Sequence, residues 1–299
     1  MAFRLAHFSD PHLNPLPRVR LRELAGKRLT GFANYLRSRR HAHDMGVLER
    51  IVADIQAQRP DHIACTGDVA HIGLEPEFEH AARFLDRLGS RDHVSFVPGN
   101  HDVYVPASLG PLTAATLPWC RSDDGAGGYP WLKVRGGVAL VGLSSAVPTG
   151  PFMAWGRAGA DQLDKAEMLL RYAGKRGLRR VVLIHHPPHR HGAKQGRELK
   201  DAAAFEAMIA AAGAELILHG HNHRTSLAWM PAPDGSQAPV VGVACASMGP
   251  AGHGEKAAWH LFDIPEDGPI TVTRRGLAPD GTLGALAQTV LRPPGVSAS

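Results

Sequence analysis

The sequence has few of the features that mark secreted, disulfide-linked or membrane-spanning proteins. It contains three cysteines, Cys65, Cys120 and Cys245, and no CxxC spacing. This odd number argues against a disulfide framework and indicates a reducing compartment. No run of about eighteen apolar residues occurs, so no membrane-spanning helix is expected. The first ten residues lack the apolar stretch and cleavage site of a signal peptide, and the sequence therefore predicts a cytoplasmic protein.

Charge is also limited, and most of it is local. Charged residues make up 20% of the chain, and Lys plus Arg exceed Asp plus Glu by 33 − 28 = 5. Between Arg18 and His43, however, eight Lys or Arg accompany a single acid, Glu23. The rest of the chain is close to neutral, so a general nucleic-acid-binding surface is not indicated and no specific nucleic acid partner is expected.

Short apolar runs alternate with amphipathic segments along most of the chain. This alternation predicts an α/β fold, with strands near 3–9, 62–66, 93–97, 138–143, 181–184 and 215–218, and helices near 43–58, 75–88, 160–172 and 201–212. Three later runs, at 240–244, 259–264 and 270–273, follow one another without helices and indicate a partly antiparallel second sheet. The connections at 103–137 and 146–159 are expected to be irregular.

One domain is expected to cover residues 1–275. The remaining segment, 276–299, is rich in Gly, Pro and Ala. We expect it to form a tail that is partly disordered or carries one short helix near Leu283 to Leu291.

Five short polar clusters each follow one of the predicted strands. Ligand sites in open α/β sheets lie beyond the carboxyl ends of strands, so the clusters are expected to converge there. Asp, Asn and His supply oxygen and imidazole ligands, which suit a pair of divalent transition metals. The clusters are Asp10-Pro11-His12, Gly67-Asp68, Gly99-Asn100-His101-Asp102, His185-His186 and Gly220-His221-Asn222-His223.

The spacing within the clusters suggests how the ligands divide. Two ions ~3.5–4 Å apart can share a hydroxide, and they need a bridging carboxylate, for which Asp68 is the candidate. On an extended segment Asp10 and His12 would point to the same side and reach one ion. His221 and His223 have the same spacing. His101 would point away from Asn100 and stay free to act as an acid or base.

The order of these motifs resembles the calcineurin-like metallophosphoesterase family over about residues 1–265, and most closely its class III cyclic-nucleotide phosphodiesterases. The resemblance implies a four-layer αββα sandwich, in which two mixed β-sheets are flanked by helices, with two divalent ions drawn from Mn, Fe, Zn and Co. It also implies the ligands of each ion. The first would be held by Asp10, His12, Asp68 and His223, and the second by Asp68, Asn100, His185 and His221.

The resemblance further implies catalytic and substrate-binding residues. His101 would protonate the leaving oxygen, oriented by Asp102, and Asn100 would also contact substrate. His71 could bind the phosphate or orient a ligand, or could be a solvated loop residue. Arg157 could line the pocket or simply pack in its loop. Only one of two consecutive side chains after a strand faces the site, so His186 is expected to be a packed neighbour of the ligand His185.

Residues 18–40 form a basic amphipathic insertion close in sequence to His12. The segment could draw in an anionic substrate, dock on an anionic lipid at the inner membrane face, or be a solvated helix. The leading hypothesis is a dinuclear phosphodiesterase for a phosphate-ester substrate, with cyclic nucleotides as one class. A lipid-directed phosphoesterase or nucleotide-linked lipid pyrophosphohydrolase is the alternative. A non-catalytic scaffold is a third hypothesis, against which the complete ligand set argues. The sequence indicates no oligomeric state.

Overall fold

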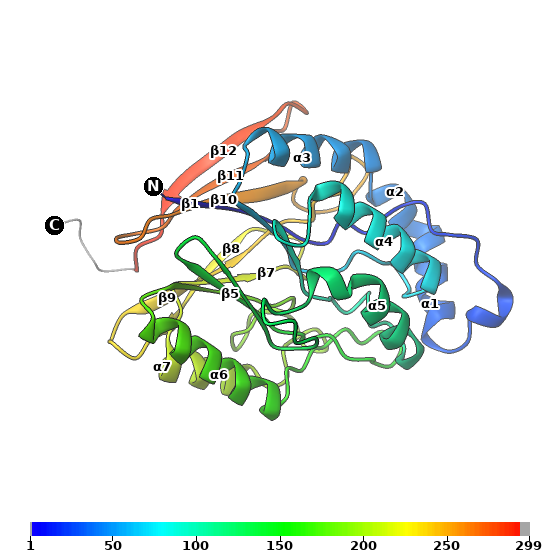
Figure 1. Cartoon of the computed structure of the whole chain (residues 1–299). Coiled ribbons are helices and arrows are strands. Elements are labelled where there is room, and N and C mark those ends of the chain that lie inside the picture. Colours follow the sequence, from blue (N-terminus) through cyan, green and yellow to red (C-terminus); the bar gives the residue numbers. More distant parts are fainter. Residues whose placement is uncertain (1, 294–299) are drawn as a thin grey trace.

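The computed structural model describes residues 2–293 and contains two six-stranded sheets packed face to face (Figure 1). The first has the order β12-β11-β10-β1-β2-β3 and the second the order β4-β5-β6-β7-β9-β8. The strands of the first sheet are β1 (Phe3–Phe8), β2 (His62–Cys65), β3 (Val94–Phe96), β10 (Ala258–Ile264), β11 (Thr271–Leu277) and β12 (Leu283–Val290). Those of the second are β4 (Trp131–Arg135), β5 (Val138–Gly142), β6 (Arg179–Leu183), β7 (Leu216–His219), β8 (Ser226–Pro231) and β9 (Gln237–Gly242).

Helices cover the outer face of each sheet. α3 (Met45–Ala57) and α4 (Glu75–Leu88) lie over the first sheet, and α6 (Ala160–Lys175) and α7 (Ala202–Ala212) lie over the second (Figure 1). The main apolar core joins residues of both sheets with α3 and α4, and a second core lies between the second sheet and its two helices. The four-layer αββα arrangement predicted from the sequence is confirmed.

Helix α3 illustrates how local sequence fixes an element. Its buried side chains, Val47, Leu48, Ile51 and Ile55, recur at the spacing of one helical face. Asp44 caps the amino end by accepting hydrogen bonds from the backbone N–H groups of the first turn. The helix therefore packs one apolar face onto the sheet, which places its first residues near the end of β1.

Within each sheet, the strands that precede the clusters run parallel to one another. β1, β2 and β3 are mutually parallel, as are β5, β6, β7 and β9. The two sheets are tied together at the carboxyl ends, where the backbone N–H of Ala246 donates to the carbonyl of Ser9 at 3.0 Å. This junction brings the clusters of both sheets to one place.

Two segments that were expected to lack strands contain them. The helix expected near Leu283 to Leu291 is wrong, because this segment is strand β12, which pairs antiparallel with β11. The expected boundary at residue 275 falls inside β11. Segment 103–137 is not wholly irregular, since it holds helix α5 (Leu109–Thr116) and strand β4. Edge strands are fixed by pairing with a neighbour, which local sequence does not show.

The basic segment folds as a succession of short helical pieces rather than one helix. These are a 3₁₀ turn (Leu21–Glu23), α1 (Lys27–Asn34), a π-helical turn (Tyr35–Arg39) and α2 (Arg40–Ala42). Phe32 packs against the apolar cluster of Ile72, Leu74 and Tyr104, whereas Leu21 is exposed. No helix within residues 2–293 is long and apolar enough to cross a membrane.

Candidate metal centre

The predicted ligands gather into two neighbouring groups at the carboxyl ends of the strands. One group contains Asp10, His12 and His223, and the other contains Asp68, His185 and His221. In each group one ligand atom of every residue lies within 4.8 Å of the others. Nearly all of these side chains are buried, and only His223 is partly exposed. β1, β2, β6 and β7 lead directly into these residues, so both sheets contribute to each group.

The spacing of the ligand atoms fits divalent ions. Two atoms bound at about 2.1 Å to one ion lie about 3.0 Å apart at a right angle and about 3.4 Å apart at a tetrahedral angle. In the first group, His223 Nε2 lies 3.2 Å from Asp10 Oδ1 and 3.4 Å from His12 Nε2. In the second, His185 Nε2 lies 3.3 Å from both Asp68 Oδ2 and Asn100 Oδ1. Asn100 Oδ1 also lies 2.8 Å from His221 Nδ1, so it belongs with the second group.

Backbone carbonyls set the tautomers of two histidines in the way that metal binding requires. His12 Nδ1 lies 3.0 Å from the carbonyl of Ala70, and His185 Nδ1 lies 2.6 Å from the carbonyl of Thr66. A carbonyl only accepts, so Nδ1 carries the proton in both rings. Each Nε2 then offers its lone pair to the group it faces, which is the usual support of a metal-bound imidazole.

The net charge of the second group changes with protonation. Burial lowers the pKa of His185, but the Asp68 and Asp10 carboxylates outweigh this and raise it to about 9. Without an ion, His185 is therefore held as a cation that pairs with Asp68. A metal ligand must be neutral, so binding an ion here releases a proton from this ring.

Backbone strain is concentrated in the ligands. Asp10, His12, Asp68, His221 and His223 all have positive φ, between 37° and 70°. Non-glycine residues seldom adopt this conformation, and such strain tends to accumulate at functional sites. Asp10 and His12 were expected to point to the same side because an extended segment was expected here. That reason is wrong, because both residues have left-handed backbone conformations, which direct their side chains toward the site.

Two glycines allow the ligand loops to approach closely. A Cβ on Gly99 would lie 2.2 Å from Asp68 Oδ1, and a Cβ on Gly220 would lie 1.9 Å from Ser9 Oγ and 2.6 Å from Asp10 Oδ2. Neither contact is possible for a larger residue without moving a ligand. These glycines therefore belong to the site, although they bind nothing themselves.

Asp102 has a different place from the one expected. Its carboxylate accepts hydrogen bonds of 2.8–2.9 Å from the backbone N–H groups of Asp68, Ala70 and Gly99. It therefore ties the two ligand loops together and does not orient His101, which corrects that expectation. Burial, and next the Asp68 carboxylate, raise the pKa of Asp102 to about 7.

His101 is oriented by His71 and Arg39. Its Nδ1 lies 2.6 Å from the carbonyl of His71, and its Nε2 lies 2.7 Å from Arg39 Nη2. The ring thus donates from Nδ1 and accepts at Nε2 from the guanidinium. Burial, and then the Arg39 charge, lower the pKa of His101 well below its usual range. The ring is therefore neutral until something changes the charge beside it.

The remaining candidates divide into supporting and distant residues. His71 is buried and contributes its carbonyl to His101, so the solvated-loop interpretation is wrong. His186 bonds to Ser145 Oγ at 2.7 Å and to the carbonyl of Ala154 at 3.1 Å, which confirms that it is a packed neighbour. Arg157 is exposed and is not among the residues that line the cavity at the site.

A cavity of about 530 Å³ opens beside the second ligand group. The metal ligand Asn100 and His101 form part of its wall, and residues 27–39 form much of the rest. Several of its polar residues were not singled out by the sequence. Lys27 and Arg39 belong to the basic segment that was expected to draw in an anionic substrate, whereas Tyr104 and Arg197 carry no motif. Only the packing of α1 and of the 185–201 loop reveals them.

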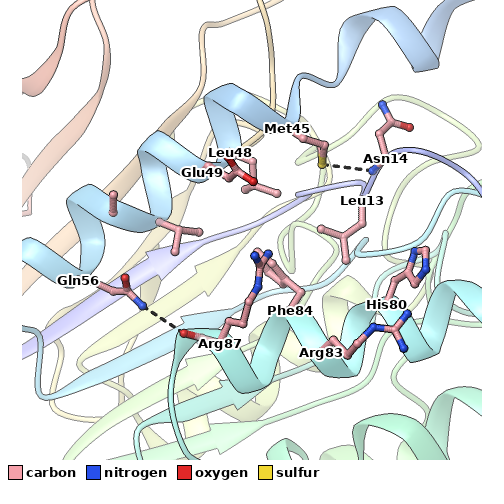
Figure 2. A pocket seen from close by; sticks show the side chains of 12 residues that line it. Leu13, Asn14, Met45, Leu48, Glu49, Gln56, His80, Arg83, Phe84 and Arg87 are labelled. Atoms are coloured by element: carbon pink, nitrogen blue, oxygen red, sulfur yellow. Dashed lines mark hydrogen bonds between the residues drawn. The ribbon is translucent and has the colours of Figure 1, made fainter.

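A larger cavity of about 730 Å³ lies between α3 and α4, on the outside of the first sheet (Figure 2). Its floor is apolar, with Leu48 and Phe84, and Gln56 crosses it to donate to the carbonyl of Arg87 at 3.1 Å. None of the seven metal ligands lines it. The smaller cavity, whose wall includes Asn100, is therefore the one that adjoins the candidate metal centre.

The fold of the chain is similar to that of solved phosphatases. A dimetal phosphatase from Danio rerio superimposes with a TM-score of 0.60 at 14% identity, over 97% of this chain and 98% of that one. Purple acid phosphatase from seeds of yellow lupin (Lupinus luteus) superimposes with a TM-score of 0.56 at 11% identity, over 95% of this chain and 53% of that one. At these identities the likeness shows the fold. No curated protein matches the sequence.

The sequence comparison is more specific than the structural one. The sequence matches the calcineurin-like phosphoesterase family over residues 3–225. This span includes all seven proposed ligands together with His101 and Asp102. Enzymes of this kind hydrolyse phosphoesters with two divalent ions, and the two groups described above provide for such a pair. The chain belongs to the calcineurin-like phosphoesterase family and is a metal-dependent phosphoester hydrolase.

Proposed function

We propose that this chain is a phosphodiesterase whose substrate places an organic group in the cavity beside Asn100. The observation that carries the proposal is the position of His101, which shares one cavity wall with a metal ligand. A cavity of about 530 Å³ lies in the size range that suits small organic ligands. It has room for a nucleoside or an aryl group, so cyclic nucleotides remain one candidate class.

In this mechanism the protein would hold the two ions and transfer one proton. Asp10, His12 and His223 would hold the first ion, Asn100, His185 and His221 the second, and Asp68 both. When bound, the ions supply Lewis-acid stabilisation of phosphoryl oxygens and an activated water.

His101 would act on the leaving oxygen through Nε2, because its Nδ1 is engaged by the carbonyl of His71. An anionic substrate bound next to Arg39 would offset the guanidinium charge that disfavours protonation of the His101 ring.

Metal restoration tests this function. The protein would be stripped of metal and reloaded separately with Mn, Fe, Zn or Co, then assayed on cyclic nucleotides, nucleotide-linked diphospholipids, aryl phosphodiesters and aryl phosphomonoesters. We expect activity to reach its full value at two ions per chain and to favour diesters. A form that hydrolyses only monoesters would contradict the phosphodiesterase assignment.

A lipid-directed phosphoesterase is the second candidate, and the exposed apolar residues around the cavity favour it. Phe152 lines the cavity and is 90% exposed, and Met153 beside it is also exposed. Leu29 and Leu36 do not line the cavity but are exposed on the same helical segment that carries Arg37. Apolar side chains interspersed with arginines are typical of surfaces that settle into an anionic membrane interface.

Vesicle binding tests the lipid candidate. The double variant Phe152→Ser and Leu36→Ser would be compared with Met168→Ser, which removes an exposed apolar residue from α6. We expect the double variant to bind phosphatidylglycerol vesicles at least ~10-fold more weakly, while Met168→Ser matches the unmodified chain. If the unmodified chain does not bind these vesicles at low salt, the substrate is a soluble ester.

A further inference from the structure

The cavity beside the metal centre has more positive charge than a single phosphate ester needs. Four cationic side chains line it, and no acidic residue does. The cations are Lys27, Arg37, Arg39 and Arg197. None of the four takes part in an ion pair within residues 2–293. Like charges in one cavity repel each other, so an anion bound there would be favoured.

Lys27 is the clearest of these cations, because it is buried. Only 7% of it is exposed, and its Nζ lies near Thr149 Oγ1 and 4.4 Å from the centre of the Tyr104 ring. An ammonium group has three donors and is seldom buried without a charged partner. Lys27 therefore has unused donors at the wall of the cavity.

A π-helical turn brings further cations to the same wall. In α1, Lys27, Gly31 and Asn34 recur at helical spacing and all line the cavity. The turn Tyr35–Arg39 is wider than an α-helical turn, so Arg39, five residues after Asn34, also reaches this face. A Cβ on Gly31 would lie 2.4 Å from the Tyr104 hydroxyl, so the helix can pack this close only with glycine there.

The scissile phosphate does not account for these cations. A phosphodiester carries one negative charge, and the two metal ions bound at the ligand groups would attract it first. Arg39 already contacts His101, which leaves Lys27, Arg37 and Arg197 for another anion. The cavity also offers Tyr104, Phe152 and Met153 as apolar wall for the organic part that joins two anions.

We propose that Lys27, Arg37 and Arg197 form a subsite for a second anionic group, a phosphate or carboxylate, on the leaving group of the substrate. The leaving group is the relevant side because His101, which would protonate it, lines the same cavity. The inference rests on the proposed phosphodiesterase function and names the class of substrate: an ester whose leaving alcohol carries its own negative charge.

A matched pair of substrates tests the subsite. Methyl 3-carboxy-4-nitrophenyl phosphate and the corresponding 3-carboxamide differ by one charge on the leaving nitrophenol, and the pKa of each released nitrophenol corrects for intrinsic reactivity. After that correction we expect the carboxylate to be preferred ~10-fold or more in kcat/KM. In the double variant Arg37→Gln and Arg197→Gln, the two kcat/KM values should differ by less than about twofold. Both arginines are exposed, so folding should not be affected.

The control variant removes two charges far from the cavity. Lys165→Gln with Arg176→Gln changes two exposed residues at α6 and should keep the full preference. If the unmodified enzyme hydrolyses both substrates without preferring the carboxylate, or if the preference survives in the Arg37 and Arg197 double variant, the subsite does not exist. Failure of the metal-loaded enzyme on both substrates would contradict the proposed function instead.

Binding to the metal-free protein gives a readout that does not depend on catalysis. Calorimetry with inorganic pyrophosphate should show binding to the unmodified chain and at least ~10-fold weaker binding to the Arg37 and Arg197 double variant. The Lys165 and Arg176 variant should bind like the unmodified chain. Absence of pyrophosphate binding, or equal binding by all three proteins, would overturn the subsite even if hydrolysis is observed.

Discussion

The ligand loops and the helical wall of residues 27–39 lie at one site but are built in opposite ways. Nearly all the ligands are buried, five of the seven have a strained backbone, and backbone carbonyls fix the rings of His12 and His185. In the wall, by contrast, Arg37 is exposed and has no acidic partner among the described residues. Metal binding needs ligand atoms that are fixed to tenths of an ångström, whereas substrate selection needs charged groups that have no partner within the protein. The chemistry and the selectivity therefore reside in different parts of the chain.

The largest expected effect comes from removing the shared ligand. Asp68→Ala should lose at least one ion and most of the activity, because this carboxylate belongs to the second ligand group and would also bind the first ion in the proposed function. Elemental analysis of the purified variant measures the loss. Asp164→Ala, an exposed change on α6, should keep both ions. Two ions retained in Asp68→Ala would sink the assignment of the bridge.

The second effect separates metal binding from proton transfer. His101→Ala should keep both ions and lose turnover by roughly 10²–10⁴-fold, as expected for removal of a general acid. The loss should be smaller for esters of nitrophenol, whose leaving oxygen needs little protonation. Measuring kcat for aryl diesters of graded leaving-group pKa gives the answer, and an equal loss across the series would mean that His101 has another role.

A third effect compares neighbouring arginines of the basic segment. Arg39 contacts both ring nitrogens of His101, whereas Arg40 is exposed and contacts His41. Arg39→Ala should lower kcat/KM by roughly 10–100-fold for every substrate, because a hydrogen bond to a charged group is lost. Arg40→Ala should change it by less than about threefold and only at low salt, where exposed charges are poorly screened. Similar losses in both variants would mean that steering, not contact, explains the basic segment.

The smallest effect concerns a buried histidine away from both regions. His62 bonds to Ser95 Oγ at 2.8 Å, and burial, then Lys133 and Arg135, lower its pKa from 6.5 to about 3. At a pH between these two pKa values, His62 is protonated in the unfolded chain but not in the folded chain. The free energy of unfolding therefore falls as the pH drops below 6.5, by up to about 1.4 kcal/mol per pH unit.

The variant His62→Gln should therefore lose less stability between pH 7 and pH 5 than the unmodified chain. Urea unfolding of the metal-free protein at both pH values measures this, because release of ions cannot then contribute. His253→Gln changes an exposed histidine and should match the unmodified chain. Identical acid sensitivity in His62→Gln would mean that other buried groups control it.

Much of the fold could be predicted because the relevant patterns are local. Apolar runs such as those of β1 and β2, and the helical spacing in α3, follow from burial of one face. The edge strand β12 could not be predicted, since its residues are mostly exposed and its conformation depends on pairing with β11. The same reason explains β8, which pairs with β9 at the edge of the other sheet.

The sequence by itself determined the seven candidate ligands and His101, because metal chemistry demands particular atoms after particular strands. Only the tertiary structure decided that Asp102 ties the ligand loops together while His71 and Arg39 orient His101. It also decided which cations line the cavity beside the candidate metal centre. Lys27 and Arg197 lie far apart along the chain, and Arg197 belongs to no motif, yet packing of α1 and of the 185–201 loop places both at one cavity. Ligand identity is a property of residues, but the surroundings of a ligand are a property of packing.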